Sequence, residues 1–209
     1  MSKTYDRVDW TFLKVVLTVM KFETRWIQWI MECVTSMSYT LLVNGTLASS
    51  FKPSQGLRQG DPLSLYLFLF CANILSIALL QAERHKQLQG VKIGRNGLSF
   101  THLLIADDSL LFFKNDNRPV NNSRAILDWY CSISSQKINL AKSDLYCSPN
   151  MAAVDQETLA STLQVNLVQD PTKYLGMNFK MRGNRYVDFQ FLVDKLQSRL
   201  QGWKARLLS

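Results

Sequence analysis

Residues 103–113 have the sequence LLIADDSLLFF and place two adjacent carboxylates, Asp107 and Asp108, between two apolar runs. Each run has the length of one buried strand, and Asp-Asp-Ser is typical of a turn. The stretch therefore predicts a β-hairpin with both carboxylates at or next to its tip. Two carboxylates this close repel each other unless water solvates the tip or a cation binds them. The stretch alone favours the solvated turn, so the rest of the chain has to decide.

The composition is that of a folded, basic protein. Of 209 residues, 47% are hydrophobic and 19% are charged, which excludes a disordered chain and suffices for one substantial core. The 24 Lys and Arg exceed the 16 Asp and Glu, which gives a formal net charge of +8. This balance favours a polyanionic partner, either nucleic acid or an anionic membrane surface.

The cysteines indicate a reducing compartment. The chain has four, far apart and in or beside apolar segments, and no Cys-x-x-Cys pair occurs. The two histidines add no metal-finger spacing. We therefore expect free thiols, no disulfide-linked partner and an intracellular location, nuclear or cytoplasmic. The polar residues 1–6 do not resemble a signal peptide.

The segment from Pro62 to Leu80 is mostly apolar and close to bilayer-spanning length. It contains Ser64, Asn73 and Ser76 and follows a polar loop. These features favour a buried core helix over a transmembrane span, and hence no membrane partner.

Helical and strand-like patterns are mixed along the chain. Helices are expected over about 8–20, with Asp6 or Asp9 as N-cap, and over 25–37, 62–82, 124–133, 155–163 and 192–207. Strands are expected at 39–43 before an Asn44-Gly45 turn, at 91–93, in the 98–113 hairpin, at 145–147, and in a hairpin from Tyr174. Residues 115–122 and 134–143 are predicted polar connections. Without a regular β-α-β order, this predicts an α+β fold, an antiparallel sheet with helices packed on one face.

The loop before the long apolar helix is a second candidate site. Residues 56–62 have the sequence GLRQGDP, in which Asp61 is a good N-cap and Pro62 a good first helical residue. Gly60 lets backbone approach a flat ligand, and Gln59 can contact a base or a sugar edge. The helix N-terminus that follows favours phosphate. The alternative to a ligand site is a loop that only connects to a core helix and caps it. Without other evidence, the loop sequence favours this alternative.

Phosphoryl transfer would use both stretches. Mg²⁺ is usually held by one or two carboxylates together with phosphates and waters, and the hairpin aspartates suit that role. Binding two metal ions normally requires a further carboxylate, and the candidates are Asp6, Asp9 and Asp61. The alternative for each of these is a helix cap.

These motifs, in this order, resemble the palm of a reverse transcriptase (RNA-directed DNA polymerase) from non-LTR, LINE-like retrotransposons of the kind abundant in plant genomes. The resemblance covers nearly the whole chain. It rests on residues 2–10 (SKTYDRVDW, the end of the first catalytic motif), 56–68 (the nucleotide-binding second motif), 105–108 (IADD, the third), 136–143 (QKINLAKS, the fourth), 174–176 (YLG, the primer grip) and 202–204 (GWK, where the thumb begins).

The resemblance implies catalytic roles. Asp107 and Asp108 would bind the catalytic Mg²⁺ (or Mn²⁺) ions. Lys142 would protonate or stabilise the leaving pyrophosphate. Tyr5 would lie under the incoming sugar and exclude a 2′-hydroxyl.

The resemblance also implies binding roles and partners. Gln59 and Gly60 would line the nucleotide pocket, with Arg58 nearby. The partners would be an RNA template, a DNA primer and a deoxynucleoside triphosphate. Basic residues of the C-terminal helix would contact the template–primer backbone; these are Lys195, Arg199, Lys204 and Arg206.

The chain departs from the family pattern. The leading metal-binding aspartate of the first motif would be the residue just before Met1, and the fingers that precede the palm are missing. The family's usual Ala, Pro, aromatic residue and Gly are replaced by Thr4, Leu65, Ile105 and Ser135. We therefore expect an incomplete palm at 1–181, the start of a helical thumb at 182–209, and a chain that is catalytically deficient alone.

Two other functions stay open. The net charge and the basic C-terminal helix favour a non-catalytic nucleic-acid-binding module. The apolar segment 62–80 would suit a membrane or scaffold protein.

Overall fold

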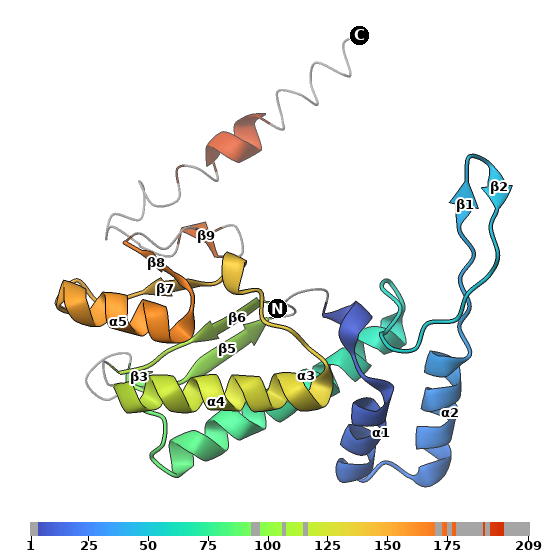
Figure 1. Ribbon diagram of the computed structural model, residues 1–209, viewed down its shortest axis with the longest axis horizontal. Coiled ribbons are helices and arrows are strands. Elements are labelled where there is room, and N and C mark those ends of the chain that lie inside the picture. Colours follow the sequence, from blue (N-terminus) through green and yellow to red (C-terminus); the bar gives the residue numbers. More distant parts are fainter. Residues whose placement is uncertain are drawn as a thin grey trace.

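A computed structural model of the chain describes residues 4–92, 97–105, 108–114, 117–169, 173–174, 177–178, 190 and 193–198. The helices are η1 (Tyr5–Arg7), α1 (Trp10–Val19), α2 (Thr24–Thr35), α3 (Pro62–Arg84), α4 (Asn117–Ser134), η2 (Leu140–Lys142) and α5 (Ala153–Leu163). The strands are β1 (Leu42–Val43), β2 (Thr46–Leu47), β3 (Val91–Lys92), β4 (Ser99–Phe100), β5 (His102–Ile105), β6 (Asp108–Leu111), β7 (Asp144–Tyr146), β8 (Asn166–Val168), β9 (Lys173–Tyr174) and β10 (Met177–Asn178). The chain is thus a mixed helix and strand protein, as expected (Figure 1).

The starts of two helices follow from local sequence. The Asp9 carboxylate accepts a hydrogen bond from the Phe12 backbone N–H at 2.8 Å, so Asp9 rather than Asp6 caps α1. The Asp61 carboxylate accepts one from Leu63 N–H at 3.0 Å, and Pro62 is the first residue of α3. Each cap satisfies a backbone donor that the helix itself leaves unpaired. The caps predicted at Asp9 and Asp61 are confirmed.

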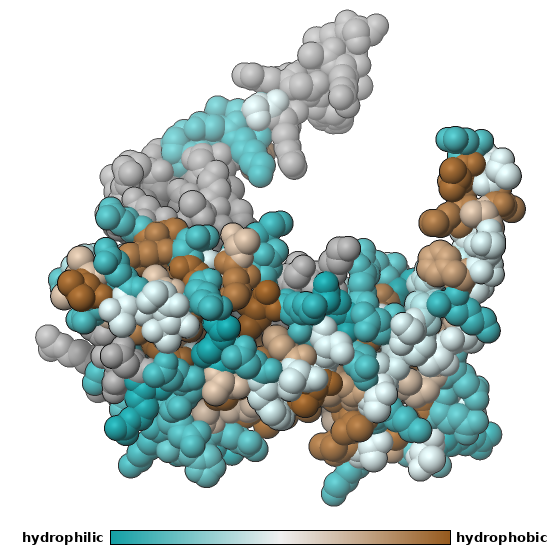
Figure 2. Space-filling model, viewed as in Figure 1, coloured by the Kyte–Doolittle hydropathy of each residue, from teal (hydrophilic) through white to brown (hydrophobic). Residues whose placement is uncertain are grey.

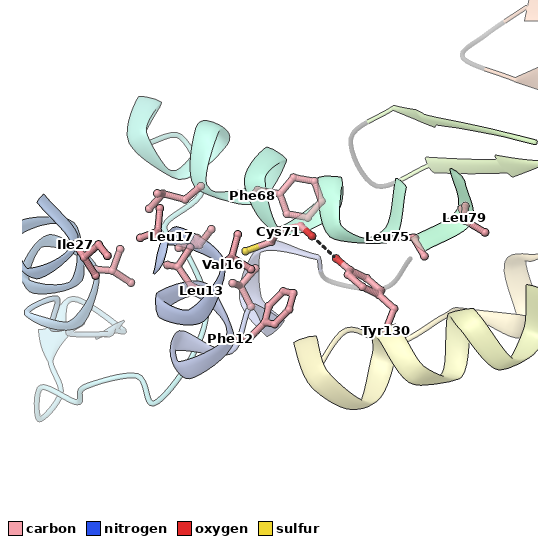
Figure 3. Close-up of a cluster of buried hydrophobic side chains, with 14 of the residues drawn as sticks. Phe12, Leu13, Val16, Leu17, Ile27, Phe68, Cys71, Leu75, Leu79 and Tyr130 are labelled. Atoms are coloured by element: carbon pink, nitrogen blue, oxygen red, sulfur yellow. Dashed lines mark hydrogen bonds between the residues drawn. The ribbon is translucent and has the colours of Figure 1, made fainter. Parts of the chain in front are cut away.

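Helix α3 forms the centre of the hydrophobic core. Its buried positions recur at helical spacing and pack against α1 and α4; they are Ser64, Leu67, Phe68, Cys71, Leu75, Leu79 and Ala82. Figure 3 shows Phe12, Leu13 and Val16 of α1 meeting this face. The Tyr130 hydroxyl of α4 donates to the Cys71 carbonyl at 3.3 Å, which satisfies the phenol inside the core.

Helix α3 is long and apolar enough to cross a membrane by length and composition alone. Its outer side chains, which include Leu65, Tyr66 and Leu69, are exposed. Its contacts with α1, α4 and β5 are those of the core helix that the sequence predicts.

The predicted single antiparallel sheet is wrong for the described residues. They form five separate two-stranded sheets instead. Four are antiparallel, but β7 and β8 pair in parallel, with α5 as the crossover between them. Strand β8 was not expected, because three residues carry too little period-two pattern to be recognised.

The polar connection predicted at 115–122 is also wrong in part, because α4 already begins at Asn117. Polar residues fill its first turns and hide the helical pattern. Pro119 suits a first helical turn, and Val120 is buried in the structure. Tertiary burial of Val120 and Ser123 thus extends the helix beyond the range that propensity favours.

A β-hairpin arm, residues 39–51, stands away from the helices (Figure 1). The predicted turn is confirmed, since Asn44 and Gly45 have φ angles of 50° and 81°. The strands themselves are shorter than predicted, with one isolated bridge between Tyr39 and Phe51. Figure 2 shows hydrophobic side chains on this arm, where Leu42 and Leu47 are 68% and 72% exposed.

The β5–β6 hairpin is confirmed, with Ile105 opposite Asp108 at its closed end. A polar contact anchors its open end on α3. His102 lies on the inward face of β5, where Nε2 is 2.7 Å from the Ser76 hydroxyl and Nδ1 is 2.9 Å from the Thr101 hydroxyl. Burial lowers the His102 pKa below 6.5, and the negative charge of Glu83 opposes this only in part.

This lowered pKa makes stability depend on pH. Between the unfolded pKa of 6.5 and the lower folded pKa, the unfolded chain binds more protons than the folded chain. The free energy of unfolding is therefore expected to fall as pH decreases through this window, by at most about 1.4 kcal/mol per pH unit. Urea unfolding at several pH values measures the slope. His102→Gln should reduce it, whereas His85→Gln, at an exposed position, should leave it unchanged; equal slopes in all three proteins would refute the assignment.

Candidate nucleotide and metal site

A hollow of about 560 Å³ opens between the start of the chain and the start of α3. Its lining combines two segments more than 50 positions apart, and the residues are Thr4, Tyr5, Gln59, Gly60, Asp61, Pro62 and Leu65. Three of the four residues predicted to bind a nucleotide, Tyr5, Gln59 and Gly60, thus share one cavity. Thr4 and Leu65, which depart from the family pattern, line it as well.

Two contacts of Tyr5 and one of Val8 hold this wall of the hollow in place. The Tyr5 ring stacks on Phe68 of α3, with centroids 4.9 Å apart and planes 25° from parallel. The Tyr5 carbonyl accepts a hydrogen bond from Leu57 N–H at 2.7 Å, and the Val8 carbonyl accepts one from Gly56 N–H at 2.8 Å. The 4–8 segment and the 56–57 loop are therefore joined like neighbouring strands, although neither is a strand.

The Trp10 indole adds a bond that the sequence did not reveal. Its Nε1–H donates to the Gly56 carbonyl at 2.8 Å, across 46 positions of sequence. Gly56 has φ of +95°, a conformation that favours glycine. The positive φ of Gly56 and the hydrogen bond from Trp10 thus fix the conformation of the 56–57 loop beside the hollow.

A second hollow of about 570 Å³ lies on the other side of the loop. Arg58 lines it rather than the first hollow, while Gln59 lines both. Asp6 and the aromatic pair Tyr39 and Phe51, with ring centroids 5.9 Å apart, belong to it too. The four predicted nucleotide-binding residues are therefore divided over two adjoining cavities.

Helix α3 also carries the hairpin with the two aspartates. Phe68, beside the hollow, and Ser76, beside His102, are eight residues apart on α3, or roughly 12 Å at 1.5 Å per residue. Strand β5 packs against α3, and Figure 1 shows β5 and β6 beside this helix. One rigid helix therefore sets the position of hollow and hairpin relative to each other.

The metal prediction stays a prediction. Asp108 is the first residue of β6 and is exposed, whereas Asp107 lies outside the described residues. Within the described part of the chain, no three His, Cys, Asp or Glu side chains form a group that could hold a metal ion. Of the further carboxylate candidates, Asp9 and Asp61 are helix caps, which is the alternative given above for each of them.

The remaining predicted residues lie away from the two hollows or outside the described part. Lys142 is the last residue of η2, is exposed and lines neither cavity. Lys195 is exposed in the helical residues 193–198. Arg199, Lys204 and Arg206 lie outside the described residues.

Three of the four thiols are poor nucleophiles near neutral pH. All four cysteines are free, as predicted. Burial raises the pKa of the Cys71 thiol to about 12, and it also raises the pKa values of Cys131 and Cys147. A thiol with a raised pKa stays protonated and unreactive near neutral pH.

Sequence reasoning assigned no role to one residue that contacts the wall of the first hollow. Gln136 is 3% exposed, and its side-chain amide donates to the Thr4 carbonyl at 2.8 Å across 132 positions of sequence. It belongs to the QKIN stretch, where a polar residue in a predicted polar connection gives no signal of burial.

Comparison with known proteins shows the family of the chain. Residues 1–179 match the model of the family described as "Reverse transcriptase (RNA-dependent DNA polymerase)". The chain is also 43% identical over 68 residues to the "Uncharacterized mitochondrial protein AtMg01250" of Arabidopsis thaliana. That match covers 32% of this chain and 56% of the Arabidopsis protein.

Proposed function

Because the chain belongs to the reverse transcriptase family, we propose that it carries the nucleotide pocket and part of the metal site of an RNA-directed DNA polymerase. Such an enzyme extends a DNA primer on an RNA template with deoxynucleoside triphosphates. We propose further that the chain descends from a plant-type non-LTR retrotransposon, with a palm at 1–181 and the start of a thumb at 182–209. The free thiols support an intracellular location, nuclear or cytoplasmic.

One observation carries the proposal. Tyr5, Gln59 and Gly60, which the resemblance assigns to the incoming nucleotide, line one cavity although the sequence separates them. The cavity adjoins the N-terminus of α3, whose positive dipole end favours the triphosphate. In the proposed function, Tyr5 would contact the sugar, and the loop at Gly60 would leave backbone accessible to a flat base.

The carboxylates of Asp107 and Asp108 would hold Mg²⁺ or Mn²⁺. Oxygen donors of this kind suit both ions, and the exposed position of Asp108 leaves its carboxylate open to a ligand. When bound, the metal neutralises charge on the transferring phosphate and the leaving pyrophosphate. Lys142 would supply a proton or a positive charge to that leaving group. The basic residues of the C-terminal helix would bind the backbone of the template–primer.

Primer extension tests the proposal. An RNA template with a DNA primer, all four deoxynucleoside triphosphates and Mg²⁺ is given to two polypeptides, one of these 209 residues and one with an aspartate added before Met1. We expect weak extension by the first and a clear increase in the second, because the added carboxylate restores the leading position of the first motif. Strong, Asp107-dependent extension by the first polypeptide would contradict the expected deficiency.

A second candidate function is nucleic-acid binding without catalysis, which the net charge of +8 favours. Neither polypeptide would then extend a primer, yet both would bind an RNA–DNA hybrid with an affinity that falls steeply as salt rises. Asp107→Ala would leave that binding intact. Absence of binding at low salt would exclude both candidate functions.

A further inference from the structure

Gln136 lies at the junction between α4 and the first residues that the structure describes. The turn that carries it follows the end of α4, where Ser135 has a φ of 59°. The Ser134 hydroxyl donates to the Tyr130 carbonyl at 2.6 Å and accepts from Gln136 N–H at 3.3 Å. The backbone of Gln136 is thus held to a helix that is itself anchored in the core.

Two hydrogen bonds attach this turn to the segment that contains Tyr5. The Gln136 Nε2–H donates to the Thr4 carbonyl at 2.8 Å, and the Asp9 N–H donates to the Ser134 carbonyl at 3.3 Å. The first bond is made by the residue immediately before Tyr5, and the second by the residue four positions after it. Together with Leu57 N–H, which binds the Tyr5 carbonyl, they hold the backbone of Tyr5 on both sides.

The Gln136 side chain is buried, and its bond to the Thr4 carbonyl restricts its conformation. It is 3% exposed, and within the described residues its Oε1 has no hydrogen-bond partner. Burying a polar amide costs free energy that only its hydrogen bonds offset. The bond to Thr4 is the one bond of this side chain in the described part of the chain, and Thr4 lines the hollow.

We propose that Gln136 is a positioning residue that sets Tyr5 against the sugar of the incoming nucleotide and so determines the preference for deoxyribose over ribose. The inference rests on the proposed function, because it assumes that the hollow binds a nucleoside triphosphate. Gln136 itself lines neither hollow and touches no ligand there. It acts through the Thr4 carbonyl, which fixes where the Tyr5 ring can stack on Phe68.

The effect should appear in selectivity rather than only in stability. A 2′-hydroxyl adds a single oxygen to the sugar, and within the lining of the hollow it is the Tyr5 ring to which the resemblance assigns its exclusion. A misplacement of about 1 Å in a group that positions a substrate can change a reaction rate by about 100-fold. Without the bond to Thr4, CTP is therefore expected to gain affinity relative to dCTP, by roughly tenfold in the ratio of the two dissociation constants.

The test measures binding and needs no turnover. The 209-residue polypeptide, Mg²⁺ and an RNA–DNA primer–template with a dideoxy-terminated primer are titrated with dCTP and with CTP. Gln136→Met removes the amide and keeps the volume, and Gln81→Met makes the same change at an exposed position of α3. We expect the CTP to dCTP ratio of dissociation constants to fall in the first variant and to stay at the parent value in the second.

Gln136→Glu provides a reversible version of the same test, which remains available if Gln136→Met fails to fold. A protonated carboxyl donates to the Thr4 carbonyl as the amide does, whereas an ionised one repels it, and burial raises the pKa of a buried Glu well above about 4.3. The selectivity of this variant should match the parent at about pH 5.5 and be lost as pH rises. Tyr5, Asp6, Arg7, Asp9 and Lys137 are the titratable groups of the joined segments, and the parent measured at each pH controls for them.

The outcomes separate this inference from the function on which it rests. If the parent prefers dCTP and both Gln136 variants do so equally at every pH, the positioning role is wrong and the nucleotide pocket stands. If the parent binds neither nucleotide, or binds both equally, the pocket assignment fails and the inference fails with it. Hydrogen exchange at the Leu57 amide adds a readout without nucleotide, since it should quicken in Gln136→Met and not in Gln81→Met.

Discussion

Gly56→Ala is expected to lower the free energy of unfolding by about 3 kcal/mol and to abolish nucleotide binding in the first hollow. A Cβ at this position would lie 2.7 Å from the Asp6 carbonyl oxygen and 3.0 Å from its carbon. Both are backbone atoms, which cannot rotate aside. The φ of +95° adds strain that an alanine cannot relieve without moving the loop.

Moving the loop would break the bonds that build the hollow. Gly56 N–H donates to Val8, its carbonyl accepts from Trp10, and the next residue binds the Tyr5 carbonyl. We therefore expect loss of stability and loss of dCTP affinity together, measured by urea unfolding and by the titration described above.

Gly45→Ala is the matched control for Gly56→Ala. Gly45 has a φ of +81°, but nothing lies within 4 Å of the Cβ that alanine would add. This variant carries only the local cost of the positive φ, about 1 kcal/mol, and should bind dCTP like the parent. If the two alanine variants lose the same stability, the close approach to Asp6 is not what constrains Gly56.

Asp108→Asn is expected to reduce primer extension by about a thousandfold, because it removes a charge that a catalytic metal requires. The side chain is exposed, and within the described residues it makes no hydrogen bond or ion pair. The substitution therefore leaves the fold intact, so a loss of extension reports on chemistry rather than on stability. Extension is measured in the polypeptide with an aspartate added before Met1.

Mn²⁺ binding followed by electron paramagnetic resonance is a second readout for Asp108→Asn, because it does not depend on turnover. The variant should bind Mn²⁺ more weakly than the parent. Asp155→Asn, which makes the same change of charge at an exposed position of α5, should leave extension and Mn²⁺ binding at the parent level. An Asp108→Asn protein that retains both would show that the hairpin aspartates form a solvated turn.

The sequence predicted those elements whose signals are local. Asp9 and Asp61 cap helices because a carboxylate next to unpaired backbone N–H groups needs no distant partner. Asn44 and Gly45 form the predicted hairpin turn for the same reason. Local sequence patterns gave wrong predictions where packing against distant parts of the chain determines the structure. Examples are the early start of α4 at Asn117 and the parallel pairing of β7 with β8.

The sequence by itself thus determined most of the helices, the hairpin turns and the two stretches that are proposed to carry chemistry, 56–62 and 103–113. It also indicated the reverse transcriptase family through their order. Only the tertiary structure decided which residues share a cavity, that Arg58 faces a different hollow from Tyr5, and that Gln136 is bound to Thr4. The physical reason is that caps and turns are bonds between neighbours in the chain, whereas the hollow depends on bonds that span 46 to 132 positions and form only when the core around α3 has packed.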